Sequence, residues 1–543
     1  MKIEIFDTTL RDGAQGEGIS FSLQDKLAVL QALDDLGVAW IEAGNPGSNP
    51  KDMEFFRIAQ SRKLKTAKLC AFGSTRRKGM ACKDDTILQG LLDAATEAVV
   101  IFGKSWDLHV TEVLKVSLEE NLAMISETVA YLKDKGRTVI YDAEHFFDGW
   151  VANPEYALKT IQAAAEAGAS RIVLCDTNGG SFPDRITGGV TAALAAVTPV
   201  GAGLKPAPTL GIHTHNDSGM ATAGAITAVQ AGCTHVQGTL IGFGERCGNT
   251  ALAEVIPGLE LKLKMQCLPE GNIKKLYQIS RQIAEIANIS LPDGMPYIGN
   301  NAFSHKAGMH ADGILKVRQS FEHIDPALVG NDRQFLISEV GGRSIIAERA
   351  KKIDAGITKD SPVTANLANK LKSLEAEGWQ FEGADASFEL LVRRELGKYK
   401  ALFTIETYQV TSEFPSPLSN DGKAARLSAS AWVKVLVDGN YEIAAAEGDG
   451  PVNALDGALR RALIRFYPEL EQIRLSDYKV RVIDGSEATA SRVRVLIEST
   501  DGVNTWNTVG VSGDVIEASR LALVDSLEYK LIGDIERRFK AYL

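Results

Sequence analysis

The chain has 543 residues, a net charge of −10, a pI near 5.5, 45% hydrophobic residues and 24% charged residues. These values exclude a disordered chain and leave no basic surface for nucleic acid or an anionic membrane. No apolar run reaches the ~18 residues of a membrane span, and the N-terminus shows no signal-peptide pattern. Six scattered cysteines without a CxxC pair indicate free thiols in a reducing compartment. We therefore expect a cytoplasmic protein of about two to four domains, with neither nucleic acid nor a membrane as partner.

Short β-type runs alternate with helical patterns along the first half of the chain. In Leu23–Leu36, for example, leucines recur at helical spacing. The β-type runs are 2–6, 38–43, 68–72, 98–102, 138–142, 171–175, 209–213 and 235–240. Eight strands alternating with helices over about 260 residues predict an α/β fold with an N-terminal (β/α)8 TIM barrel. An open doubly wound sheet is the alternative, although its glycine-rich dinucleotide turn is absent after the first run.

Metal-ligating side chains follow three of the predicted strands, at the end where a barrel carries its active groups. His213 and His215 are two residues apart, so both imidazoles point to the same side of an extended strand. Asp12 follows the first strand and Asn249 follows the eighth, which closes against the first. This set of ligands suits Mg²⁺, Mn²⁺ or Zn²⁺. A pair of surface histidines without a metal is the alternative.

Further polar side chains follow other strand ends, and each has two interpretations. Arg11 forms either a structural ion pair with Asp12 or a fork for a carbonyl or carboxylate. Glu42 either holds Arg11 in place or contacts the metal's water. Thr177 either binds a substrate carboxylate or caps a turn, and Glu144 is either an acid/base or an ordinary exposed glutamate. A divalent ion with open positions would chelate a 2-oxo acid and polarise its ketone.

Four motifs in a fixed order carry a family resemblance. They are 7–15 (DTTLRDGAQ), 213–217 (HTHND), 236–249 (VQGTLIGFGERCGN) and 304–313 (SHKAGMHADG). Together they resemble the 2-isopropylmalate synthase superfamily, which includes homocitrate and citramalate synthases and hydroxymethylglutaryl-CoA lyase. The resemblance covers essentially the whole chain. The stretches 42–50 and 322–331 are most similar to those of citramalate synthases.

The resemblance implies a metal-dependent condensation of acetyl-CoA with pyruvate, followed by thioester hydrolysis that releases CoA and (R)-citramalate for isoleucine biosynthesis. It also implies roles for individual residues. Asp12, His213, His215 and Asn249 would bind the metal, Glu42 and Arg11 would serve substrate binding, and Arg11 would also steady the oxyanion. Thr177 would bind the pyruvate carboxylate, Glu144 would be a catalytic acid/base, and His310 would reach the site of a partner subunit.

The chain departs from the family beside His310. Phe321 stands where the family often has a tyrosine, just before the Ile-Asp-Pro segment. The phenol that helps hydrolysis or positions water there is therefore missing. Either His310 and water suffice, or Tyr297 or another residue takes its place.

The second half of the chain divides into a linking region and a repeat. Residues 266–350 are loop-rich, helical patterns follow near 364–377 and 387–398, and 411–423 is a turn-forming linker. In the last part, 433–437 resembles 493–497, and each run precedes an amphipathic helix. We expect three domains, namely a catalytic barrel over 1–265, helical linker subdomains contributing to a neighbouring active site over 266–420, and an α+β domain with an internal repeat over 421–543.

The family resemblance implies that the last domain is allosteric and binds an amino acid at a dimer interface. Isoleucine is the expected effector and leucine the alternative, in a homodimer or a higher homo-oligomer. Two glycine turns, 448–451 and 511–514, are candidate effector loops, because backbone N–H groups at helix starts accept a carboxylate.

Three other functions compete with this interpretation. One is 2-isopropylmalate synthase, with a larger pocket for 2-oxoisovalerate; Phe72 and Phe102 either shrink the pocket towards pyruvate or belong to the barrel core. A lyase is disfavoured by the regulatory domain. The last is a non-catalytic, amino-acid-sensing metal-binding barrel, which would need no acid/base set such as Arg11, Glu144, Thr177 and His310.

Overall fold

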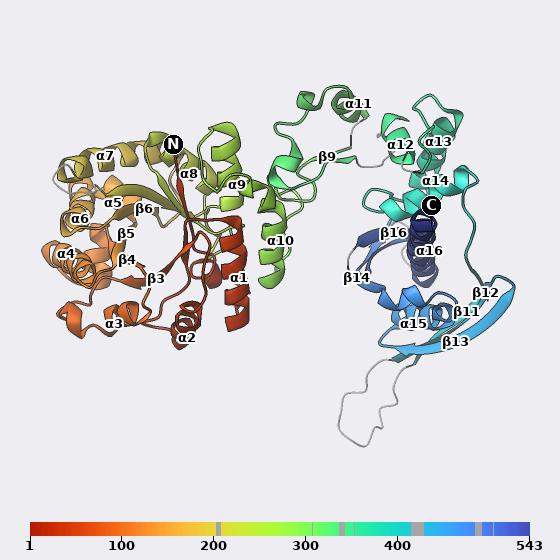
Figure 1. Ribbon diagram of the computed structural model, residues 1–543, viewed down its shortest axis with the longest axis horizontal. Coiled ribbons are helices and arrows are strands. Elements are labelled where there is room, and N and C mark those ends of the chain that lie inside the picture. Colours follow the sequence, from red (N-terminus) through yellow and green to blue (C-terminus); the bar gives the residue numbers. More distant parts are fainter. Residues whose placement is uncertain are drawn as a thin grey trace, which may run out of the picture. The chain divides into compact units, whose positions relative to one another are not determined.

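The structure, a computed structural model, describes the chain except residues 202–207, 307, 336–342, 352, 414–427, 484–490, 503 and 543. It divides into two compact units (Figure 1). The first comprises Met1–Phe303 with Ile324–Arg333, and the second comprises Ser304–His323 with Gln334–Leu543. Most of the predicted linker 411–423, and the boundary at 420, lie outside the described residues. None of the helices in the described part has an apolar stretch of the length that a membrane span requires.

The first unit contains a closed barrel of eight parallel strands in sequence order (Figure 1). The strands are β1 (Glu4–Asp7), β2 (Trp40–Glu42), β3 (Lys68–Ser74), β4 (Ala98–Lys104), β5 (Thr138–Glu144), β6 (Arg171–Asp176), β7 (Thr209–Thr214) and β8 (His235–Gly238). Each overlaps one predicted run. The barrel closes where β8 pairs with β1, with Val236 opposite Ile5. The predicted TIM barrel is therefore confirmed, and the open sheet is excluded because β1 and β8 leave no free edge.

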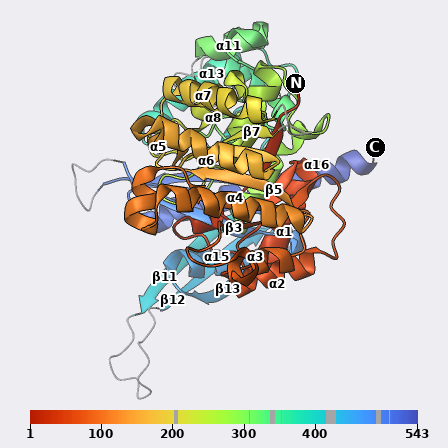
Figure 2. The same cartoon turned by 90° about the vertical axis from the view of Figure 1, so that its left-hand side faces the viewer.

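Helices surround this barrel, and Figure 2 shows several of them in front of its sheet. They are α1 (Leu23–Leu36), α2 (Pro50–Ala59), α3 (Thr86–Asp93), α4 (Leu118–Asp134), α5 (Phe146–Ala152), α6 (Pro154–Ala167), α7 (Pro183–Gly201), α8 (Ala221–Ala231), α9 (Leu252–Pro257) and α10 (Leu276–Ile286). Local sequence sets their ends. Ser22 and Asp25 form a capping box at the start of α1, and Gly37 ends it in the left-handed conformation.

Apolar side chains fill the barrel between its walls. The interior cluster comprises Phe6, Trp40, Cys70, Ala98, Val100, Ile140, Val173 and Cys175. A larger cluster packs the helices against the outside of the sheet. Because the interior is packed, polar groups at the carboxyl ends of the strands stand above a solid apolar floor, where a barrel carries its active site.

The chain leaves the first unit after Phe303 and returns to it at Ile324–Arg333. Asn331 anchors the returning segment, because its side-chain amide donates to the carbonyls of Tyr297 and Gly299 at 3.0 and 3.1 Å. The region 266–350, predicted as loop-rich, includes α10, α11 (Gly308–Lys316) and α12 (Arg343–Ala350). The sequence analysis did not anticipate the return of this segment to the barrel.

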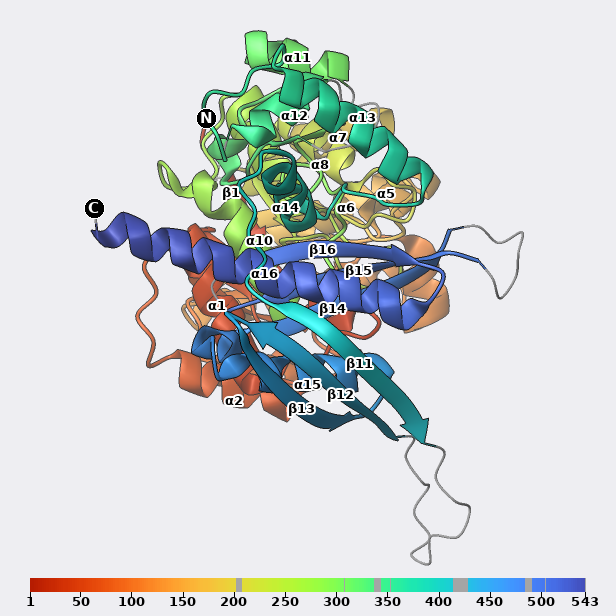
Figure 3. The same cartoon turned by 90° about the vertical axis from the view of Figure 1, so that its right-hand side faces the viewer.

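The second unit carries the predicted repeat (Figure 3). Helices α13 (Pro362–Ala376) and α14 (Asp385–Glu395) match the two helical patterns. Each half of the repeat is a three-stranded antiparallel sheet followed by a helix. The first half contains β11 (Thr404–Glu413), β12 (Ser428–Val437), β13 (Asn440–Gly448) and α15 (Pro451–Ile464). The second half contains β14 (Arg474–Val482), β15 (Val493–Thr500), β16 (Thr505–Ser512) and α16 (Val515–Tyr542). The two similar runs, 433–437 and 493–497, lie in the central strands β12 and β15. The α+β repeat is confirmed.

Candidate active site

Three of the four predicted metal ligands converge above the barrel floor. Asp12 follows β1, His213 lies on β7 and His215 follows it; one ligand atom from each lies within 4.8 Å of the others. Asp12 Oδ2 is 3.3 Å from His213 Nε2 and 4.0 Å from His215 Nε2, and the two ring nitrogens are 3.4 Å apart. Ring nitrogens that face each other and a carboxylate at such distances need a cation or a proton between them.

Asn249, the fourth predicted ligand, follows β8. An isolated bridge joins its backbone to that of His215. Among the residues that the structure describes, its side chain is buried with neither the oxygen nor the nitrogen hydrogen-bonded. A buried amide without a partner is costly, and a metal ligand is one explanation of it. The residues present therefore fit a divalent cation.

The charges of this set also suit a metal. Burial opposes ionisation of Asp12, but Arg11 and His213 outweigh it and hold the pKa of Asp12 well below its usual range. Burial and the neighbouring His213 lower the pKa of His215 to about 4. An ionised carboxylate beside a neutral imidazole is the protonation state in which both bind a metal.

A hydrogen-bond chain inside the barrel orients His213. Its Nδ1 lies 2.9 Å from Oε1 of Gln237 on β8, and Gln237 Nε2 donates to Asp142 Oδ1 on β5 at 3.1 Å. The amide nitrogen of Gln237 donates to Asp142, so its amide oxygen faces His213. His213 must then carry its proton on Nδ1, which leaves Nε2 for a metal. Burial raises the pKa of Asp142 to about 7. Gln237 and Asp142 were not predicted as site residues, because nothing in the sequence shows that they link across the barrel to His213.

Arg11 forms the predicted ion pair with Asp12 and is held by Glu42. Its Nε donates to Glu42 Oε2 at 2.5 Å, one of its terminal nitrogens lies 3.2 Å from Asp12 Oδ2, and its guanidinium stacks on Phe72. Glu42 is fully buried, and Thr8 donates to the same oxygen at 2.8 Å. Glu42 thus holds Arg11 from behind and is not among the residues that line the neighbouring cavity.

A cavity of about 230 Å³ opens beside the metal ligands. Its lining brings together six of the predicted site residues: Arg11, Asp12, Glu144, Thr177, His213 and His215. Glu144 forms an ion pair with Lys104. The Thr177 hydroxyl oxygen accepts the backbone N–H of His145 at 2.9 Å, which leaves its own proton available to a ligand. Phe72 and Phe102 stack with ring centroids 5.4 Å apart and also line this cavity.

Two polar residues next to the histidines have structural contacts. Asn216 accepts the N–H of Ala221, the first residue of α8, at 3.2 Å. Asp217 forms a two-pronged ion pair with Arg246 at 2.8 and 2.9 Å. Arg246 also donates to the carbonyl of Thr177 at 2.7 Å. The contacts of Asn216 and Asp217 therefore brace the rim of the cavity and do not involve the histidine side chains.

His310 belongs to the second unit and the metal ligands to the first. His310 is exposed on α11, where its ring stacks on Phe321 with centroids 4.3 Å apart and planes inclined by 25°. Tyr297 belongs to the first unit, and burial raises its pKa. The two candidate effector turns directly precede α15 and α16.

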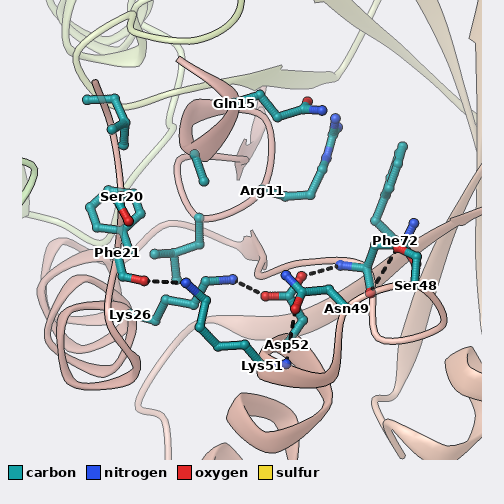
Figure 4. Close-up of a pocket in the computed structure, with 14 residues that line it drawn as sticks. Arg11, Gln15, Ser20, Phe21, Lys26, Ser48, Asn49, Lys51, Asp52 and Phe72 are labelled. Atoms are coloured by element: carbon teal, nitrogen blue, oxygen red, sulfur yellow. Dashed lines mark hydrogen bonds and ion pairs between the residues drawn. The ribbon is translucent and has the colours of Figure 1, made fainter. Parts of the chain in front are cut away.

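A second cavity, of about 350 Å³, lies next to the first and shares Arg11, Gln15 and Phe72 with it (Figure 4). Its other polar lining comes from the segment before α1, from the β2–α2 connection and from the two helices themselves: Ser20, then Asn45, Ser48 and Asn49, then Lys26 on α1 and Lys51 and Asp52 on α2. Arg11 therefore stands at the boundary between two polar cavities. The sequence analysis did not foresee the second one.

Three family models match the chain in succession. The HMGL-like model matches residues 2–283, the homocitrate synthase post-HMGL domain-like model matches 297–378, and the LeuA allosteric (dimerisation) domain model matches 382–531. The first alone covers more than half of the sequence.

Full-length relatives narrow the family further. The (R)-citramalate synthase of Synechocystis sp. is 48% identical over 527 residues, covering 97% of this chain and 96% of the relative. That of Aquifex aeolicus is 48% identical over 535 residues, covering 98% and 99%. A probable 2-isopropylmalate synthase of Methanopyrus kandleri is 30% identical over 96% of this chain and 97% of its own length. The chain therefore belongs to the HMGL-like family and, within it, to the (R)-citramalate synthases, which are acyltransferases.

Proposed function

We propose that this chain condenses acetyl-CoA with pyruvate, hydrolyses the resulting thioester and releases CoA and (R)-citramalate. The observation that carries the proposal is the convergence of Asp12, His213 and His215 on a cavity that also holds Arg11, Thr177 and Glu144, in a chain 48% identical to (R)-citramalate synthases over its length.

Asp12, His213, His215 and Asn249 would hold a divalent cation, Mg²⁺, Mn²⁺ or Zn²⁺, which when bound would polarise the ketone of the 2-oxo acid. Thr177 would donate its free hydroxyl proton to the pyruvate carboxylate. The Arg11 guanidinium, fixed by Glu42 and Asp12, would face the keto oxygen, where negative charge develops. Glu42 would act through Arg11.

Glu144 is the acid/base of the proposed reaction. Its carboxylate would take a proton from the acetyl methyl group, whose C–H electron pair then forms the bond to the keto carbon of pyruvate. The keto oxygen takes up a proton and becomes the hydroxyl of the product. Water then adds to the thioester, the C–S bond breaks, and the thiol of CoA leaves with a proton. His310, which we propose reaches the site of a partner subunit, would serve the hydrolysis, in which Phe321 has no proton to give.

Two aromatic rings support pyruvate over 2-oxoisovalerate. Phe72 and Phe102 stack in the wall of the first cavity, where they would limit the room for a branched substrate side chain. The larger cavity beyond Arg11 suits the acyl-CoA arm, because its volume of about 350 Å³ lies in the range of ligand sites. 2-Isopropylmalate synthesis remains the second candidate, and the lower identity of the relative of that name disfavours it.

We also propose a separate role for each of the three predicted domains. Residues 1–265 would carry catalysis, 266–420 would link subunits and contribute to a neighbouring site, and 421–543 would bind an effector. The match to the LeuA allosteric (dimerisation) domain supports a homodimer or higher oligomer and an amino-acid effector. We propose isoleucine, with leucine as the alternative. The free state of all six cysteines supports a cytoplasmic location.

CoA release from acetyl-CoA tests the function directly. Metal-loaded protein is incubated with pyruvate, 2-oxobutyrate, 2-oxoisovalerate or 2-oxoglutarate, with and without isoleucine and leucine. Preference for pyruvate with inhibition by isoleucine supports the proposal. Preference for 2-oxoisovalerate moves the chain to isopropylmalate synthesis with the same mechanism. Release with none of the acids contradicts the proposal and favours a non-catalytic, amino-acid-sensing barrel.

A further inference from the structure

A buried ion pair lies at the edge of the second cavity. Lys26, on α1, has its ammonium 2.5 Å from Asp52 Oδ1 on α2 (Figure 4). The same ammonium donates to the carbonyl of Ala43 at 2.8 Å. Both side chains are buried, and both line the cavity. A buried ion pair contributes little net stability compared with apolar residues of the same size. Stability alone therefore does not account for a lysine and an aspartate at this place.

Lys26 and Asp52 hydrogen-bond the two ends of the turn 43–45. The second carboxylate oxygen of Asp52 accepts the N–H of Asn45 at 2.9 Å, while Lys26 binds the carbonyl of Ala43. Gly44, between them, has a φ of +142°, and a Cβ there would lie 2.4 Å from the carboxylate carbon of Asp52. Asp52 thus occupies the space that a side chain at Gly44 would need. The path of the turn 43–45 is set by the two charged groups.

This turn directly follows Glu42, the residue that holds Arg11. Glu42 ends β2, and its carboxylate is fixed by Arg11 and Thr8 at 2.5 and 2.8 Å. Asn45, on the other side of the turn, lines the second cavity. Because Thr8 and Arg11 hold the Glu42 carboxylate separately, a displacement of the turn would move mainly the wall of that cavity.

We propose that Lys26 and Asp52 are positioning residues for acyl-CoA: their ion pair holds the turn 43–45 and, with it, Asn45 in the wall of the second cavity. The inference rests on the proposed function, which assigns the second cavity to the acyl-CoA arm. Neither residue contacts the metal ligands in the hydrogen bonds and ion pairs of the described chain. The pair should therefore affect acyl-CoA and leave metal binding alone.

Two substitutions test this positioning. Asp52→Asn keeps the size of the side chain. The groups that contact Asp52, the Lys26 ammonium and the Asn45 N–H, are both donors. Because an amide has only one acceptor oxygen, the variant loses one of these two contacts. Lys26→Met keeps the aliphatic stem and removes the ammonium. We expect kcat/KM for acetyl-CoA to fall about tenfold to a hundredfold, as for a small misplacement of reacting groups. The KM for acetyl-CoA should rise more than that for pyruvate, and the calorimetric affinity for Mn²⁺ should stay unchanged.

Two further variants separate positioning from a general loss of structure. Asp35→Asn breaks an ion pair of the same length, 2.5 Å to Lys65, which also involves α1 but is exposed to solvent, and it should leave all constants unchanged. Lys26→Arg restores a cation with several donors and should recover part of the lost acetyl-CoA affinity.

Wild-type constants in both Asp52→Asn and Lys26→Met would overturn the proposal. So would a parallel loss of acetyl-CoA, pyruvate and Mn²⁺ binding in variants that melt earlier, because that pattern indicates a structural role. The failure of the proposed function looks different, since the wild-type protein itself would then release no CoA. In that case the calorimetric affinities of wild type and Asp52→Asn for acetyl-CoA still decide whether the pair positions this cavity.

Discussion

Gln237 is the only hydrogen-bond partner of His213 Nδ1 within the described chain, so replacing it tests how the metal site is held. In Gln237→Leu, the side chain keeps a similar size but loses the acceptor for His213 and the donor for Asp142. Two buried groups then lack partners, and the imidazole loses the contact that fixes its protonation and orientation. Outer hydrogen bonds of this kind are worth about 10–100-fold in metal affinity, which corresponds to about 1.4–2.7 kcal/mol.

Titration calorimetry with Mn²⁺ near neutral pH measures this loss without any turnover. Gln162→Leu is the matched control, because that glutamine lies outside the barrel wall on α6 and, among the described residues, donates to the carbonyl of Ala196 alone. We expect the control to bind Mn²⁺ like the wild type. A folded Gln237→Leu protein with wild-type Mn²⁺ affinity would refute the idea that this hydrogen-bond chain prepares His213 for the metal.

Three other variants probe the site and the barrel. His213→Ala should abolish CoA release, and an excess of Mn²⁺ should restore part of it; full activity without added metal would exclude ligation. Phe102→Ala should move the ratio of kcat/KM values towards 2-oxoisovalerate by about 1–3 kcal/mol, whereas an unchanged ratio would place Phe102 in the core only. Arg171 and His235 hold the pKa of Glu4 well below its usual range despite partial burial. The stability that ionised Glu4 adds is therefore present above its unfolded pKa of about 4.3 and is lost as the pH falls below that value. Glu4→Gln should lower the free energy of unfolding by up to about 1 kcal/mol near neutral pH. Near pH ~4 the same substitution should lower it by less. Urea unfolding at both pH values measures this difference, and an equal effect at both would contradict it.

Local patterns predicted the barrel and most of its rim. Alternating strands and helices are encoded over short stretches, since each strand needs a β-type run and each helix needs apolar residues at its own spacing. The two-residue spacing of His213 and His215 places both rings on one side of a strand by geometry alone. The pairing with Asp12, about two hundred residues away, also followed once the barrel was predicted, because β7, β8 and β1 must then be neighbours.

Residues inside or behind the rim escaped prediction. Gln237 and Asp142 lie within strands, where a polar residue in one sequence gives no sign of its partner across the barrel. Lys26 and Asp52 lie on different helices and meet only because both helices pack beside the turn 43–45. Glu42 ends a strand, as predicted, but only the folded chain shows that its carboxylate turns towards Arg11 instead of the cavity.

By itself, then, the sequence determined the fold class, the repeat in the C-terminal part and the convergence of Asp12, His213 and His215, because each depends on local periodicity or on the order of elements around a closed barrel. Only the tertiary structure decided which groups hold these side chains: the acid behind Gln237, the ion pair that grips the turn at Gly44, and the return of Ile324–Arg333 to the barrel. The physical reason is that a hydrogen bond between distant segments depends on where both backbones are placed to within a few tenths of an ångström, and only the packing of the whole unit sets that distance.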